Sequence, residues 1–180
     1  PTESRGLGDV YKRQGFCVFN DLAFTALTLT KTKEVKNILI FDCDVHQGDG
    51  TARILENNDR TFTCSIHSSK NFPYRKANSD LDIGVEDNMS WFGYKRHLIE
   101  GLNKCIERFS PDLVLYVAGV DIHANDKLGR LSIDDEGLFE REMIVLNFFK
   151  KRDIPIATVM GGGYSDDTVS YTHLRAHETQ

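Results

Sequence analysis

The residues best suited to chemistry follow an apolar run in the first third of the chain. Residues 38–41 are Ile-Leu-Ile-Phe, and the next eight, DCDVHQGD, include Asp42, Asp44, His46 and Asp49. Because side chains alternate along a strand, we expect Asp42, Asp44 and His46 to share one side. Open α/β sheets bind ligands at the carboxyl ends of their strands. Two carboxylates and an imidazole there predict a site for zinc or another divalent transition metal rather than calcium.

Two later segments also place polar residues directly after apolar runs. Asp121 follows the apolar residues 113–119, which predicts its carboxylate at the same sheet edge as Asp44 and His46. Three protein ligands leave a coordination position open for water, as a catalytic zinc requires. Taken alone, Asp121 is more often a helix N-cap or turn residue. The segment GGGY at 161–164 allows close backbone approach and presents Tyr164, although a glycine-rich turn with a core tyrosine is the simpler interpretation.

An alternation of strands and helices is predicted to position these residues. Apolar periodicity and capping signals predict helices over residues 18–32, 47–57, 89–109 and 132–150. Strands are expected over residues 37–44, 61–67, 113–119 and 154–160. This order, with strands that are apolar on both sides, predicts a three-layer α/β/α fold with a mostly parallel sheet.

Composition narrows the class of protein. At 180 residues and 40% hydrophobic residues, the chain suits one globular domain or a piece of a larger one. A net charge of −5 without a dense basic block argues against nucleic acid as the main partner. Its four cysteines form no C-x-x-C pair, and we expect buried, reduced thiols. With no apolar run as long as a membrane span, a cytoplasmic protein without membrane contact is expected, and no feature fixes its oligomeric state.

Both ends of the chain differ from the rest. Residues 1–14 (PTESRGLGDVYKRQ) and 169–180 (VSYTHLRAHETQ) lack apolar periodicity and resemble translated sequencing adapter. We therefore expect the domain to comprise residues 15–168, with non-native tails on either side. Ordinary flexible termini are the simpler alternative.

Four motifs together resemble the histone deacetylase superfamily. They are GFCVFND at 15–21, DCDVHQGDGT at 42–51, AGVDIHANDKLGRL at 118–131 and GGGYSDD at 161–167. The HQG sequence and the segment KNFPYRKANSDLDI at 70–83 are most similar to the class IV branch and its bacterial relatives. The resemblance implies an incomplete arginase/deacetylase fold, a zinc-dependent amidohydrolase, and an acyl-lysine peptide or acylated amine as substrate.

The resemblance also implies roles for individual residues. The implied zinc ligands are Asp44, His46 and Asp121. Tyr164 resembles the phenol that hydrogen-bonds the substrate carbonyl and its oxyanion, and Asp42 and Asp49 match acids that orient a catalytic histidine pair. An implied structural potassium site includes backbone oxygens and comprises Asp42, Asp44, His46, Ser65 and Ile66.

Substrate contacts follow from the same resemblance. Phe16 and Phe72 resemble the aromatic pair that lines a narrow acyl-lysine tunnel, and Gly15 lies beside it. By residue type alone, either phenylalanine is more simply explained as core packing.

One departure from the family pattern is serious. The family's adjacent histidine pair should lie shortly before Gly15, where the sequence reads GDVYKRQ, and no histidine precedes His46. We therefore expect an internal fragment of an enzyme, nearly inactive as written. Three alternatives stay open: a noncatalytic metal-binding remnant, an acetylpolyamine amidohydrolase, and a haloacid-dehalogenase-type magnesium phosphatase. The phosphatase would use Asp42 as nucleophile but leaves Asp121 and GGGY unexplained.

Overall fold

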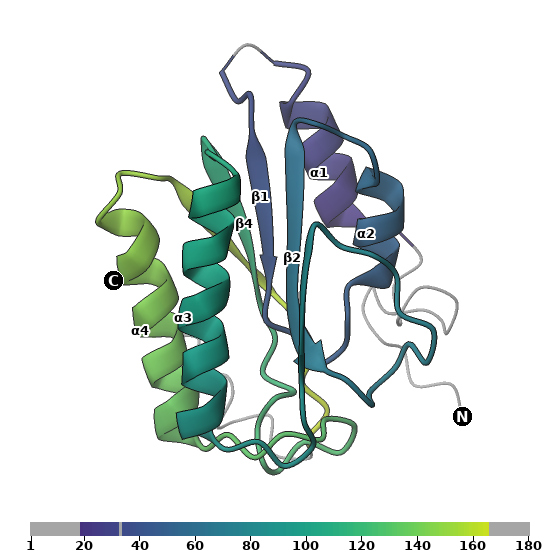
Figure 1. Ribbon diagram of the computed structural model, residues 1–180, viewed down its shortest axis with the longest axis vertical. Coiled ribbons are helices and arrows are strands. Elements are labelled where there is room, and N and C mark those ends of the chain that lie inside the picture. Colours follow the sequence, from purple (N-terminus) through teal and green to yellow (C-terminus); the bar gives the residue numbers. More distant parts are fainter. Residues whose placement is uncertain (1–18, 33, 166–180) are drawn as a thin grey trace.

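The computed structural model describes residues 19–32 and 34–165, which form one parallel sheet flanked by helices (Figure 1). The sheet order is β3-β2-β1-β4-β5. Its strands are β1 (Ile38–Asp42), β2 (Thr61–Ser68), β3 (Leu81–Val85), β4 (Leu113–Ala118) and β5 (Ile156–Met160). The helices are α1 (Asp21–Leu29), α2 (Asp49–Leu55), α3 (Trp91–Arg108) and α4 (Asp135–Lys150).

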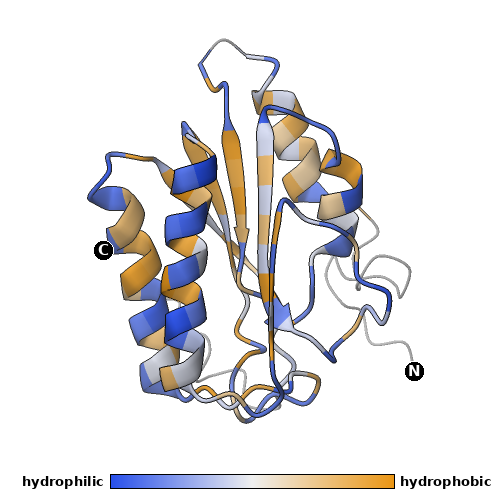
Figure 2. Cartoon of the chain, in the orientation of Figure 1, coloured by the Kyte–Doolittle hydropathy of each residue, from blue (hydrophilic) through white to orange (hydrophobic). Residues whose placement is uncertain are grey.

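Helices cover both faces of the sheet, so the fold is the predicted three-layer α/β/α arrangement. On one face Ile38 and Ile40 of β1 pack with Ala23 and Ala26 of α1. The alternate residues of β1 enter the larger core beneath α3 and α4, whose buried members include Leu39, Phe41, Leu98, Leu102, Val145 and Phe149. Every residue of β1 is buried, as expected for a strand covered on both sides, and Figure 2 shows this central strand as strongly hydrophobic.

The order in which the strands are added to the sheet reverses between the neighbouring strands β1 and β4. From β1 it passes through α2 to β2 on one side, whereas β4 and β5 lie on the other side of β1. Connections between parallel strands are right-handed as a rule. The connection through α2 crosses the sheet in one direction and those through α3 and α4 cross it in the other, so α2 and the α3–α4 pair lie on opposite faces. The carboxyl ends of β1 and β4 therefore bound the crevice in which such sheets bind ligands.

The predicted elements are confirmed in type and order, with two differences. The sequence prediction omitted β3, a short edge strand that contains Gly84. The strand predicted to run to residue 44 ends at Asp42, so Asp44 and His46 lie in the following loop. Three cysteines of the described chain, Cys43, Cys64 and Cys105, are free and buried as expected. Among the described residues, no helix is long and apolar enough to cross a membrane.

Candidate metal centre

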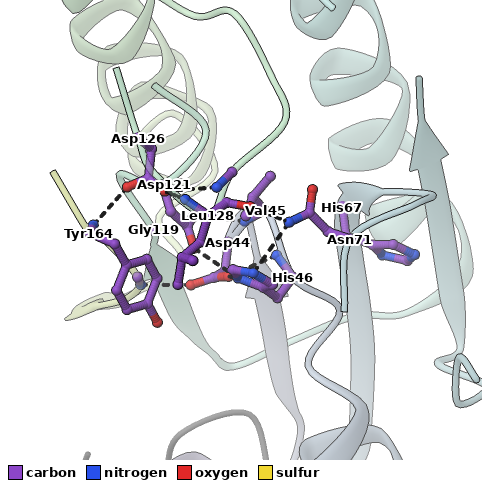
Figure 3. A network of polar contacts seen from close by, with 12 residues as sticks. Asp44, Val45, His46, His67, Asn71, Gly119, Asp121, Asp126, Leu128 and Tyr164 are labelled. Atoms are coloured by element: carbon purple, nitrogen blue, oxygen red, sulfur yellow. Dashed lines mark hydrogen bonds and ion pairs between the residues drawn. The ribbon is translucent and has the colours of Figure 1, made fainter. Parts of the chain in front are cut away.

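Three side chains converge at the carboxyl ends of β1 and β4. Asp44, His46 and Asp121 each offer one donor atom, and these atoms all lie within 4.8 Å of one another. His46 Nδ1 lies 3.1 Å from Asp44 Oδ1 and 3.0 Å from Asp121 Oδ2 (Figure 3). Tetrahedral ligands at about 2 Å from zinc are separated by roughly 3.3 Å. The donor set therefore fits zinc with only small adjustments.

Backbone amides orient the two carboxylates of this group. Val45 N donates to Asp121 Oδ1 at 2.8 Å, and His46 N donates to Asp44 Oδ1 at 2.8 Å. Gly162 N, beyond the end of β5, donates to Asp44 Oδ2 at 2.6 Å. The loops after three strands thus hold the donors. Hydrogen bonds from these loops, and not the alternation of side chains along one strand, explain why the donors converge.

The buried acids and the histidine of the group shift one another's pKa values. Burial and the neighbouring Asp44 raise the pKa of Asp121 to about 8. Burial alone would lower the pKa of His46, but hydrogen bonds to Asp121 and Asp44 outweigh burial and raise that pKa to about 10. Burial would raise the pKa of Asp44, but His46 outweighs it and the net shift is downward. The raised pKa of His46 and the lowered pKa of Asp44 describe an imidazolium beside a carboxylate, a place where a divalent metal ion can supply the positive charge instead.

The glycine segment after β5 packs directly against the acids. A methyl group built on Gly162 would lie 2.0 Å from Asp121 Oδ2 and 2.8 Å from Asp44 Oδ2. Close backbone approach, expected from the sequence, is therefore required at this position.

Substitution of Gly162 by alanine is expected to disrupt the metal centre, because the added methyl occupies space held by both carboxylates. Metal affinity measured by competition with a chromophoric chelator should fall at least tenfold. Gly50→Ala is the matched control, since a methyl group there meets its nearest atom, Asn20 Nδ2, at 3.5 Å. Equal affinities for the two variants would show that the carboxylates do not need this glycine.

Tyr164, to which the resemblance gave a catalytic role, lies beside the group. Its ring centroid is 6.2 Å from that of His46, with the planes nearly perpendicular. Asp126, which the sequence analysis missed, fixes the tyrosine backbone: its Oδ2 accepts from Tyr164 N at 2.7 Å. Its Oδ1 accepts from Leu128 N and Gly129 N, both at 2.8 Å. An Asp followed closely by Gly is typical of a turn, and this pattern could have indicated the role of Asp126 from the sequence.

Asn71 is a second neighbour that sequence reasoning missed. It is buried, its Nδ2 donates to Leu128 O at 2.7 Å, and the same nitrogen lies 3.3 Å from His46 Nε2. In the view of Figure 3, Asn71 and Tyr164 lie on opposite sides of the three donors. Asn71 belongs to the segment 70–83 that carried part of the family resemblance, but that segment assigned it no role, because its contacts come from segments far apart in sequence.

Asp42, Asp49 and Phe72 are the other predicted catalytic and substrate residues that the structure describes. Asp42 ends β1 outside the donor group, where its Oδ1 accepts from Asp44 N at 2.9 Å. Burial, reinforced by Asp44, raises the pKa of Asp42 well above its ordinary value. Asp49 begins α2 and lies 3.4 Å from Arg53 Nε. Phe72 is partly exposed and adjoins Asn71, whereas the predicted Gly15 and Phe16 lie outside the described residues.

Three residues of the expected potassium site, Asp42, Ser65 and Ile66, lie on neighbouring strands, whereas Asp44 and His46 lie in the loop after β1. Asp42 of β1 faces Ser65 of β2 in the parallel register, and Ile66 beside it is fully buried. Ser65 Oγ lies 3.0 Å from His67 Nδ1. Burial lowers the pKa of His67 to about 4, so this histidine is neutral near pH 7.

The carboxyl ends of the strands are where open α/β sheets bind their ligands, and the three donors lie there. The chain belongs to the histone deacetylase domain family, whose profile matches residues 10–179. The match confirms the resemblance inferred from the four motifs and does not favour the phosphatase alternative.

Individual relatives agree with this assignment. An uncharacterized protein of Picosynechococcus sp. is 42% identical over 165 residues, covering 91% of this chain and 55% of the relative. Histone deacetylase 2 of Arabidopsis thaliana is 31% identical over 153 residues, covering 83% of this chain and 40% of the relative. The crystal structure of a histone deacetylase homologue from Aquifex aeolicus shares the fold, with a TM-score of 0.75 at 23% identity, over 91% of this chain and 45% of that one. The chain thus spans about half the length of these three proteins.

Proposed function

We propose that this chain carries the metal centre of a zinc-dependent deacylase that hydrolyses acyl-lysine amides or acylated amines. The observation that carries the proposal is the convergence of Asp44, His46 and Asp121 at one sheet edge, with Tyr164 beside them. A phosphatase mechanism would leave His46 and Asp121 without a task.

The proposed chemistry divides between the metal and the protein. Asp44, His46 and Asp121 would hold zinc, which when bound would polarise an amide carbonyl and lower the pKa of a water molecule toward about 7. Tyr164 donates its phenolic hydrogen to the oxygen on which negative charge develops. Deprotonation of the water needs a general base, and Asp42 and Asp49 are proposed to orient the histidine pair that supplies it.

The histidine pair has no counterpart among the 45 residues before His46, none of which is a histidine. We propose that this chain alone binds zinc but turns over substrate poorly, since losing one member of a cooperating catalytic group removes most of the group's effect. A structural potassium ion is proposed beside the zinc, with Asp42 and Ser65 among its ligands.

The substrate class is tested on a protein extended upstream through an adjacent histidine pair. It is expected to hydrolyse acetyl-lysine peptides or an acetylated polyamine, to be inhibited by a zinc-chelating hydroxamate, and to leave aryl phosphates intact in magnesium buffer. Comparing the rates of hydrolysis of the peptide and of the polyamine shows which kind of amine the substrate carries. Phosphate release that disappears in Asp42→Asn would overturn the proposal in favour of a phosphatase.

A further inference from the structure

Arg141 of α4 is fully buried, although arginine is almost never fully buried without partners. It lies on the inner side of the helix, where Leu138 and Val145 are also buried. Removing a guanidinium from water costs free energy, and replacing such a group by apolar residues is often neutral or stabilising. Its presence therefore calls for a role other than stability.

The contacts of Arg141 lead directly to the metal centre. Its Nη1 donates to Gly119 O at 2.6 Å and approaches Cys43 O at 3.3 Å. Cys43 immediately precedes Asp44, and Gly119 lies two residues before Asp121. One nitrogen atom thus bridges the backbones of the two segments that supply the acids.

The spacing between these segments is already tight. A methyl group built on Gly119 would lie 2.6 Å from Asp44 Cα. A small shift of either backbone would therefore be transmitted to the acidic side chains.

The rest of the guanidinium is held from the other side. Arg141 Nε donates to Glu142 Oε1 at 2.7 Å, and Nη2 donates to the same oxygen. A planar guanidinium can bind Glu142 and both carbonyls together, whereas a lysine ammonium offers only a single point of charge.

We propose that Arg141 is a positioning residue of the metal centre: it holds the carbonyls of Cys43 and Gly119 together and so sets the separation of Asp44 and Asp121. This inference rests on the proposed zinc site. Arg141 itself touches neither the acids nor, in this proposal, the substrate.

The test compares metal binding by variants of the full-length protein. Arg141→Met combined with Glu142→Gln removes the charges together, which leaves no buried ion unpaired. Zinc affinity, measured by chelator competition, is expected to fall about tenfold to hundredfold, the range for residues that orient metal ligands. The visible absorption of bound cobalt(II) should also change. The single variant Arg141→Lys is expected to bind zinc more tightly than the double variant, because the lysine ammonium restores a hydrogen-bond donor.

The control is Arg152→Met, which removes an arginine near the exposed end of the same helix. Circular dichroism and thermal melting of the metal-free proteins establish that each variant is folded. Unchanged zinc affinity and cobalt spectrum in a folded double variant would overturn the role of Arg141 while leaving the zinc site intact. Failure of the wild-type protein to bind zinc would overturn both proposals.

Discussion

Replacing His46 with alanine is expected to abolish zinc binding at micromolar metal. His46 Nδ1 contacts both carboxylates of the donor group, so its loss removes a ligand and leaves Asp44 and Asp121 facing one another without a cation. The decrease in affinity should exceed the ten- to hundredfold effect typical of residues that merely orient a ligand. Isothermal titration calorimetry with zinc measures the change.

His67→Ala is the matched control for this experiment. His67 is also a buried histidine near the sheet edge, but it contacts Ser65 and is not a member of the donor group. Its replacement should leave zinc affinity within a few-fold of wild type. Similar losses in the two variants would mean that the ligands have been misassigned.

Substitution of Tyr164 by phenylalanine is expected to lower kcat by roughly a hundredfold to a thousandfold, the effect of removing one oxyanion donor. Zinc affinity should not change, because the ring stays in place: Asp126 holds Tyr164 through the backbone amide, which the substitution retains. Steady-state hydrolysis of an acetyl-lysine peptide by a protein that includes the histidine pair gives kcat directly.

Tyr74→Phe provides the comparison, since Tyr74 is a strongly exposed tyrosine. It should turn over substrate at the wild-type rate. If Tyr164→Phe does so as well, Tyr164 has no part in the proposed chemistry.

Much of this fold could be predicted because strands and helices alternate and the central strands are apolar throughout. The omitted β3 did carry a period of two at Leu81, Ile83 and Val85. Its five residues, interrupted by Gly84, were too short to distinguish from a loop, and pairing with β2 stabilises it as an edge strand.

The sequence placed the three candidate ligands at one edge of the sheet, where they do converge, but for an incomplete reason. Alternation along a strand does not bring Asp44 and His46 together, since β1 has already ended; loop amides do so. Arg141 was missed because charged residues are expected on the surface. Its spacing from Leu138 and Val145 nevertheless matches the buried face of an amphipathic helix, and this pattern could have indicated that Arg141 is buried.

The donor group joins parts of the chain that are distant in sequence, since His46 and Asp121 are 75 positions apart. An ion bound only by the folded protein acts as a reversible crosslink between these parts. At a free concentration a hundred times its dissociation constant, such an ion adds about 2.7 kcal/mol to the free energy of unfolding. The supply of zinc in the cell would then govern how long each molecule survives proteolysis, and metal starvation would reduce the amount of this protein as well as its activity.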